Sequence, residues 1–168
     1  GFFTNAFSLS ITSATPLVTI VYTTNGSLPS LSNGYIYTSP LTINRTTVLR
    51  AAGFRDGFYP SDADTETYIF PADVIRQSPN GETPPGWPSS WGNNVVDYGM
   101  DPNIVNSGAY AGELIADLKS IPTFSIVTDL KYLFDPATGI YSNPGGDGLA
   151  WERPTSLELL NPDGSDGF

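Results

Sequence analysis

Two stretches of the chain decide the fold: IVYTTNGSLPS at residues 20–30 and TVLRAAGF at residues 47–54. Side chains from residue 18 to residue 23 alternate with the two-residue period of a β-strand. Asn25-Gly26 follows, a dipeptide that favours a tight hairpin turn because both residues tolerate positive φ. The second stretch is rich in β-branched and apolar residues, which favour strands. The two stretches therefore predict strands, with a hairpin turn after the first.

Four further strand candidates surround these two. They cover residues 7–11, 35–37, 40–43 and 66–70. Turn sequences such as Asn33-Gly34 and Asp56-Gly57 separate the candidates. Short strands with turn signals every 8–12 residues or so, roughly the spacing seen here, are typical of an antiparallel β-sandwich. We therefore expect residues 1–70 to form one.

The composition narrows the possible functions. The 168 residues include 17 acidic and 7 basic side chains, a formal charge of -10, and neither His nor Cys. Without His and Cys there is no Ser-His-Asp triad, no thiol nucleophile and no ordinary zinc site. Few Lys and Arg are present to neutralise phosphates, so nucleic acid is not an expected partner. No apolar run is long enough to span a bilayer, so no membrane span is expected.

Residues 71–108 differ in character from the first seventy. The segment from 78 to 88 is rich in proline, which removes backbone donors and fixes φ, so it does not predict regular structure. Trp87, Trp91 and Tyr98 nevertheless bring more apolar area than a solvated linker carries. We expect an ordered arm, rich in Pro, Gly and Trp, that packs on another part of the chain.

The last sixty residues predict a partial α+β unit. The expected elements are a helix over 109–119 with Ser107 as N-cap, a buried strand over 122–128, a helical turn from 129 to 134 and a strand over 155–160. The sequence stops just after this strand, in what looks like the middle of an element. The whole chain is thus expected to be mainly β: a sandwich at 1–70, an arm at 71–108 and an incomplete unit at 109–168.

Residues 4–70 resemble the chitobiase/β-hexosaminidase C-terminal-type domain, a sandwich of the immunoglobulin or fibronectin type III kind. The resemblance is carried by YTTNGSLP at residues 22–29, by YTSPLTI at residues 37–43 and by LRAAGF at residues 49–54. It implies an Ig/FN3-like fold for this region. It assigns no catalytic residue.

Residues 109–168 look like the beginning of a CotH-type domain, the spore-coat family related to atypical kinases. The carrying stretches are IPTFSIVTD at 121–129, LFDPATGIY at 133–141 and WERPTSLEL at 151–159. The resemblance implies that the nucleotide-binding lysine and the metal-binding acids of that family lie further along than Phe168. It further implies a large secreted bacterial protein in which the two domains are paired.

Aromatic residues of the arm are the first candidate site. Trp87, Trp91 and Tyr98 are candidates for a carbohydrate-binding platform, because aromatic faces bind the apolar faces of sugar rings. The alternative is that these side chains attach the arm to one of its neighbours, and we favour that interpretation.

Carboxylates and amides are the second candidate site. Asp97 and Asp101 flank a Tyr-Gly-Met sequence, and Asn143 and Asp147 lie in a glycine-rich loop. Oxygen ligands of this kind bind Ca²⁺, so these four residues are candidate calcium ligands. The alternative for the aspartates is turn capping, which Asp in Gly- and Pro-rich loops commonly performs. No other cofactor is expected.

Three functions stay open. The preferred one is a non-catalytic structural or adhesive segment of a secreted or cell-surface bacterial multidomain protein, acting in docking or assembly. Few Lys, many Thr, Ser, Asn and Gly, and a low pI fit that location. The alternatives are a carbohydrate-binding module and the N-terminal regulatory part of a secreted CotH-like protein kinase. We expect this chain itself to be no enzyme.

An unpaired strand edge near Thr155 to Leu160 predicts protein partners. Such edges pair with strands of other chains. We therefore expect an oligomer, a filament or a larger complex, with a glycan as a further possible partner.

Overall fold

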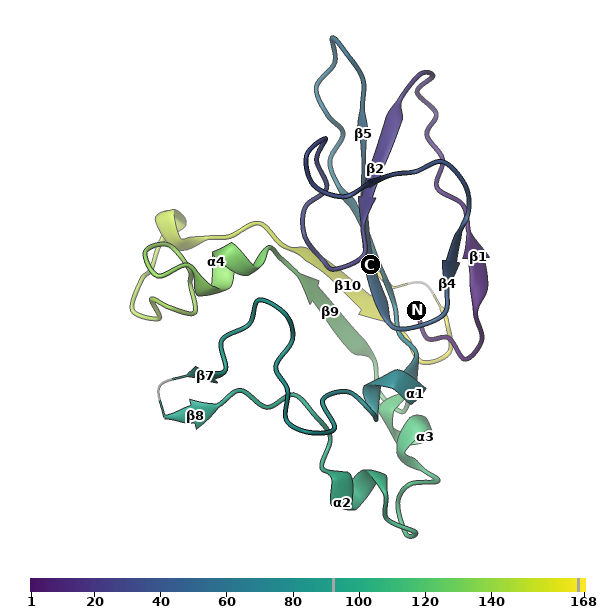
Figure 1. Ribbon diagram of the computed structural model, residues 1–168, viewed down its shortest axis with the longest axis vertical. Coiled ribbons are helices and arrows are strands. Elements are labelled where there is room, and N and C mark those ends of the chain that lie inside the picture. Colours follow the sequence, from purple (N-terminus) through teal and green to yellow (C-terminus); the bar gives the residue numbers. More distant parts are fainter. Residues whose placement is uncertain (92, 166) are drawn as a thin grey trace.

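The computed structural model describes residues 1–91, 93–165 and 167–168, and of Trp91 it describes the backbone alone. The first seventy residues form two packed antiparallel sheets, which confirms the predicted mainly β fold class (Figure 1). The larger sheet has the order β3-β2-β5-β6, with β2 at Thr19–Thr23, β3 at Tyr35–Ile36, β5 at Thr47–Phe54 and β6 at Asp64–Tyr68. The smaller sheet pairs β1 (Phe7–Leu9) with β4 (Leu41–Ile43).

The core lies between these two sheets. Its buried members are Ile43, Leu49, Tyr68 and Phe70. Phe7 of β1 closes the core from the other side, with its ring centroid 5.4 Å from that of Tyr68. Ile43, Leu49 and Tyr68 occupy inward-pointing positions of β4, β5 and β6, and Phe70 follows β6 at the N-cap position of α1, so strand alternation builds most of this core.

The turn at Asn25-Gly26 is present, but it is not the hairpin that we expected. Gly26 has a φ of 77°, and Asn25 Oδ1 accepts a hydrogen bond of 3.1 Å from the Ser27 N–H. The turn therefore closes locally, through a side chain, and does not place the following residues opposite β2. The strand β3 pairs with β2 only after a loop that runs over residues 24–34.

The arm is ordered, as predicted, and holds more regular structure than its proline content suggests. Its elements are α1 (Pro71–Val74), β7 (Ser90–Trp91), β8 (Asn94–Val95) and α2 (Pro102–Val105). The Trp87 ring meets the Phe134 ring edge-on at 5.2 Å between centroids. Beside it, Gly86 has a φ of +84°, a left-handed conformation that favours glycine, and it lies close to the Leu130 side chain of α4.

The helix expected over 109–119 is shorter than predicted. It begins only with α3 (Leu114–Leu118), and residues 107–113 form a series of turns. Gly108 and Gly112 explain the difference, because glycine loses more backbone entropy than other residues on entering a helix. In the part of the chain that the structure describes, no helix has the length and apolar character that crossing a membrane requires.

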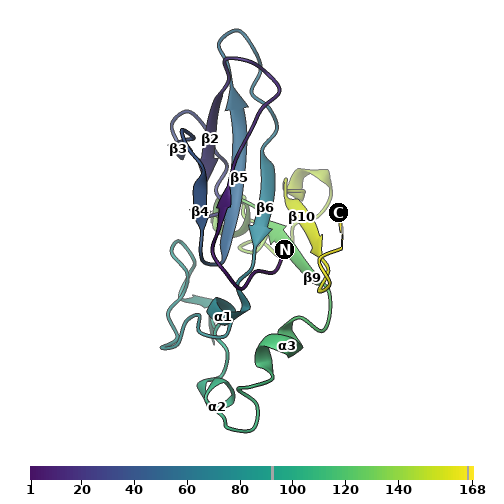
Figure 2. The ribbon, with the colours of Figure 1, turned by 90° about the vertical axis from the view of Figure 1, so that its right-hand side faces the viewer.

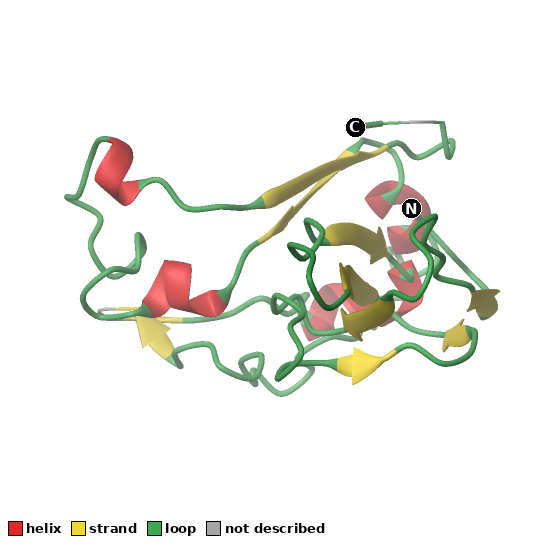
Figure 3. Cartoon of the chain, turned by 90° about the horizontal axis from the view of Figure 1, so that it is seen from above, coloured by secondary structure: helices red, strands yellow, loops and turns green. Residues whose placement is uncertain are grey.

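The C-terminal unit is built on one strand pair, and both of its predicted strands are confirmed. Strands β9 (Thr123–Val127) and β10 (Ser156–Leu160) run antiparallel, with α4 (Leu130–Phe134) and the 3₁₀ turn η1 (Leu149–Trp151) between them in the chain. Seen from above in Figure 3, the pair runs past the sandwich and carries the connection with α4 out to one side.

The prediction that β9 is buried along its whole length was wrong. Phe124 and Ile126 are 60% and 69% exposed, whereas Val127 is 6% exposed. Consecutive strand residues point to opposite faces, so Ile126 and Val127 cannot both face one neighbour. The face with Ser125 and Val127 lies against the sandwich, and the face with Phe124 and Ile126 lies in solvent.

The edge of β10 that faces away from β9 is the one that we expected to be open. At this edge the Leu159 N–H donates a hydrogen bond of 2.9 Å to the Phe168 carbonyl oxygen. One position of the edge is therefore occupied by the chain itself. Pairing of this edge with another chain stays a prediction.

Candidate docking interface

The larger sheet has a second face, which points away from β1 and β4. Because strand side chains alternate, Val21, Thr23, Arg50 and Thr67 lie together on this outer face. Their exposed fractions are 2%, 3%, 9% and 4%. One face of an antiparallel sheet commonly faces water, so burial of these mostly polar side chains means that other segments cover it.

Two segments cover the outer face. The loop 24–34 folds over β2, where the Thr23 hydroxyl donates to the Ser27 carbonyl oxygen. Strands β9 and β10 stand beside β6 (Figure 2), and a Cβ on Gly26 would lie 3.5 Å from Val127 Cγ1. We call the contact between the outer face and residues 123–158 the docking interface.

Hydrogen bonds at β6 form the first half of the docking interface. Glu158 of β10 accepts two bonds from Thr67, one from its N–H at 3.0 Å and one from its hydroxyl. The Thr67 hydroxyl also lies 2.7 Å from Ser125 Oγ of β9. Two residues earlier on the same face of β6, Thr65 Oγ1 lies 2.8 Å from Ser156 Oγ of β10. The outward backbone and hydroxyl groups of an edge strand are thus satisfied by side chains of the C-terminal unit.

A buried ion pair forms the second half. Arg50 Nη1 of β5 lies 3.5 Å from Asp129 Oδ1, and the two side chains are 10% and 17% exposed. The same carboxylate oxygen accepts a hydrogen bond of 2.9 Å from the Leu28 N–H. Asp129 stands at the N-cap position of α4 but makes no side-chain cap bond there. Its carboxylate instead accepts hydrogen bonds from residues of the sandwich.

Three carboxylates gather at the rim of the docking interface. Partial burial, followed by repulsion from Glu158 and Asp64, raises the pKa of Glu66 above its ordinary value. Burial, with the same carboxylates around it, raises the pKa of Tyr68 to about 12. Folding therefore brings acidic groups together at a place where proton uptake relieves repulsion.

Glu66→Gln is expected to alter the pH dependence of stability. A carboxyl whose pKa is raised by folding binds its proton more tightly in the folded chain, so its favourable contribution is present at low pH. That contribution is lost as the pH rises from the ordinary value of 4.5 through the raised pKa. The stability of Glu66→Gln relative to the unsubstituted chain should therefore be greater at pH 7 than at pH 4, as measured by urea unfolding.

The control for this prediction is Glu152→Gln, which removes an exposed carboxylate elsewhere in the chain. Its effect should change less between the two pH values. A difference between Glu66→Gln and the unsubstituted chain that is the same at pH 4 and pH 7 contradicts the coupling.

The three aromatic residues named from the sequence contact different parts of the molecule. Trp87 packs on α4 through Phe134 and is 40% exposed. Tyr98 lies beside α1, where its carbonyl oxygen accepts a bond of 2.9 Å from Gln77 Nε2, and its side chain is 37% exposed. The Trp91 side chain lies outside the described part. Trp87 thus attaches the arm to the C-terminal unit, and sugar binding by these three residues stays a prediction.

Three of the four residues named as calcium ligands make hydrogen bonds to backbone groups near them in the sequence, and the fourth is exposed. Asp97 Oδ1 accepts the Gly99 N–H at 3.0 Å, and Asp101 Oδ1 accepts the N–H of residue 103 at the start of α2. The Asn143 amide donates to two carbonyl oxygens of its own loop, and Asp147 is exposed. Among the described residues no group of three or more His, Cys, Asp or Glu is arranged to hold a metal ion. A calcium site stays a prediction.

The residues of the docking interface were not predicted from the sequence. Threonines at alternate positions of β6, among them Thr67, look like the solvent face of a sandwich, so their pattern carries no signal. Arg50 is different, because it interrupts an otherwise apolar and small strand at residues 47–54. A guanidinium in the middle of a core strand requires a carboxylate partner, and this was the one signal available.

Comparison with known families agrees with the fold. Residues 9–68 match the family model described as Fn3 associated. The match runs from the last residue of β1 to the last residue of β6, so this region is an FN3-associated, Ig-like domain. No curated protein and no solved structure matches the chain. The resemblances to chitobiase-type and CotH-type domains stay predictions.

Proposed function

We propose that this chain is a non-catalytic structural segment of a secreted or cell-surface bacterial multidomain protein, in which the FN3-associated domain docks and orients the unit at residues 109–168. The observation that carries the proposal is the docking interface. A sheet face with Arg50 and Thr67 at 9% and 4% exposure suits a permanent covering more than a free surface. Its hydrogen bonds fix an orientation, which apolar contacts alone do less well.

Composition supports the non-catalytic and extracellular parts of this proposal. The chain lacks His and Cys, and its charge of -10 favours solubility over binding to anionic surfaces. The matched family supports an extracellular setting, because FN3-associated domains occur in extracellular proteins. If residues 109–168 belong to a CotH-type domain, the docking interface holds the first strands of that domain against the sandwich.

Spin labelling tests whether the two units are fixed relative to each other. The chain contains no Cys, so Thr42→Cys on β4 and Leu149→Cys in η1, both exposed, give two clean labelling positions. We expect a single narrow distance distribution by double electron–electron resonance, because the docking interface removes the freedom of the arm.

The matched control carries the same two labels with Asp129→Ala and Glu158→Ala, which remove both halves of the docking interface. Its distance distribution should broaden. A broad distribution in the chain without these two changes contradicts the proposed function, because the sandwich then does not hold residues 109–168 in one orientation.

A further inference from the structure

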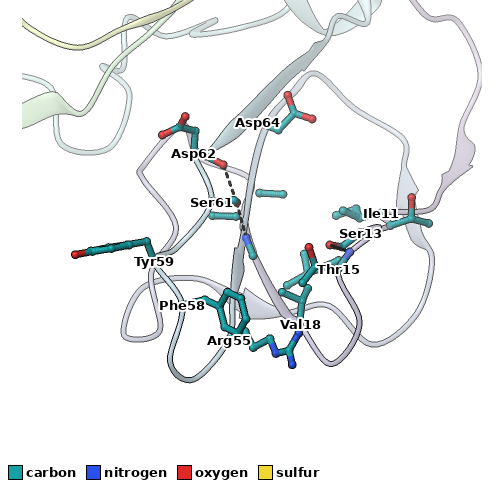
Figure 4. Close-up of a pocket in the computed structure, with 15 residues that line it drawn as sticks. Ile11, Ser13, Thr15, Val18, Arg55, Phe58, Tyr59, Ser61, Asp62 and Asp64 are labelled. Atoms are coloured by element: carbon teal, nitrogen blue, oxygen red, sulfur yellow. Dashed lines mark hydrogen bonds between the residues drawn. The ribbon is translucent and has the colours of Figure 1, made fainter.

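A hollow opens at the end of the sandwich that lies away from α1 and the arm. It lies between the β1–β2 connection and the β5–β6 connection and has a volume of about 260 Å³ (Figure 4). These loops stand free at the top of Figure 1. The docking interface lies on another face, so the hollow is open when the two units are joined.

The floor of the hollow results from a change in side-chain size along β5. Inward positions on this strand run from Leu49, a core residue, to Ala51 and then to Gly53. The two small residues leave the space between the sheets unfilled at this end. Val18 and Ile20 complete an apolar floor, with Val18 Cγ2 at 3.4 Å from the position of a Cβ on Gly53.

Aromatic side chains form one side of the rim. Phe58 is 62% exposed and Tyr59 is 99% exposed. Gly57, with a φ of 78°, makes the turn in which the Phe58 N–H donates to the Arg55 carbonyl oxygen. The Arg55 guanidinium lies 4.6 Å from the Phe58 ring centroid, and Tyr59 projects outward from the rim in Figure 4. Core packing gives no reason for two large rings at this exposed loop tip.

Polar groups form the other side. Asp62 and Asp64 line the hollow with the hydroxyls of Ser13 and Thr15. In the described part of the chain, neither carboxylate has a hydrogen-bond or ion-pair partner. Ser61, by contrast, is already used, since its hydroxyl accepts the Gly53 N–H and donates to the Asp62 carbonyl oxygen. The hollow thus combines an apolar floor, exposed rings and uncommitted acceptors.

A second hollow continues from the first over the loop tips. It shares Arg55 and Phe58 with the first and is bordered by Leu17. Leu17 is 87% exposed and has a φ of 57°, a left-handed conformation that is unfavourable for a residue with a Cβ. Strain of this kind is concentrated at binding sites, and here it holds an apolar side chain next to the rim.

We propose that the hollow binds a neutral pyranose residue of a glycan, with the chain of sugars continuing over Tyr59. A sugar ring has an apolar face, which Phe58 and Tyr59 match, and a girdle of hydroxyls, which donate to Asp62 and Asp64. The volume is just below that of pockets for drug-sized ligands, roughly 300–1,000 Å³, and therefore suits a single ring. Two carboxylates against one arginine disfavour an acidic sugar.

The test begins with an array of neutral and acidic oligosaccharides probed with the whole chain, followed by calorimetry with the best neutral ligand. We expect binding to neutral glycans. Tyr59→Ala and Phe58→Ala should each weaken it by about tenfold, the loss expected for one stacking contact. Asp64→Asn should weaken it as well. Tyr110→Ala, which removes a 54% exposed tyrosine near the arm, is the matched control and should bind unchanged.

Three outcomes overturn the proposal. The first is no binding to any glycan, and the second is binding to acidic glycans alone. The third is loss of binding in Trp87→Ala with Tyr59→Ala unaffected, which places the sugar on the arm. Because Tyr59 is almost fully exposed, Tyr59→Ala should unfold at the same temperature as the unsubstituted chain, which separates lost binding from lost folding.

Discussion

Asp129→Ala is expected to lower the free energy of unfolding by about 3 kcal/mol, the low end of the range for breaking a buried ion pair. The substitution leaves the Arg50 guanidinium, 10% exposed, without its carboxylate, and it deprives the Leu28 N–H of its acceptor. Arg50 Nη1 then keeps only its hydrogen bond of 3.2 Å to the Gly26 carbonyl oxygen, and within the described residues Arg50 Nε has no hydrogen-bond partner. The low end applies because the 3.5 Å separation is long for such a pair.

The measurement is urea unfolding followed by tryptophan fluorescence. All three tryptophans lie between residues 87 and 151, so the signal reports on the arm and the C-terminal unit. Urea is preferred to guanidinium chloride, because a salt screens the interaction under test. Loss of the docking interface should appear as an earlier transition of this signal.

The chain offers a matched control for the same carboxylate. Lys131 Nζ lies 3.9 Å from Asp129 Oδ2, and the lysine side chain is 65% exposed. Lys131→Ala should change stability by less than about 0.5 kcal/mol, as exposed pairs usually do. Asp129→Ala together with Arg50→Met should cost less than Asp129→Ala alone, because the double variant leaves no uncompensated charge. An Asp129→Ala variant as stable as Lys131→Ala contradicts the buried pair.

The sandwich could be predicted from the sequence because its signals are local. Alternation at 18–23 and the β-branched run at 47–54 determine which side chains face inward, and Leu49 and Tyr68 follow from that. Helix length was predicted less well, since one-sided apolar spacing at 109–119 was outweighed by two glycines. Local pattern decides an element only where nothing else opposes it.

The docking interface could not be predicted, for a different physical reason. It depends on residues that are 58 to 101 positions apart, such as Leu28 and Asp129. It also depends on an alternation that looks the same whether a threonine meets water or a neighbouring strand. The same ambiguity caused the error at β9, where Phe124 and Ile126 looked like core. The hollow at the loop tips was not predicted either. It depends on the small residues Ala51 and Gly53, and the sequence does not show whether a larger side chain from another segment fills the space beside them.

Glu158→Ala is expected to cost about 2 kcal/mol, because it removes the acceptor of the Thr67 N–H and one partner of the Thr67 hydroxyl. Thr67 is 4% exposed, so water does not readily replace the carboxylate. Its hydroxyl keeps Ser125 as a neighbour at 2.7 Å. The N–H has no such substitute, and the penalty for a buried donor without an acceptor makes up most of the loss.

Amide hydrogen exchange at Thr67 distinguishes this local loss from general destabilisation. In Glu158→Ala the Thr67 amide should lose more protection than the amides of β5, which keep their ladder with β6. Glu158→Gln is the matched variant, because it keeps one acceptor oxygen and removes the charge that repels Glu66. It should lose about half as much as Glu158→Ala at pH 7. If exchange at Thr67 rises no more than at β5, the carboxylate does not protect the edge of β6, and the docking interface does not depend on the Glu158 hydrogen bonds.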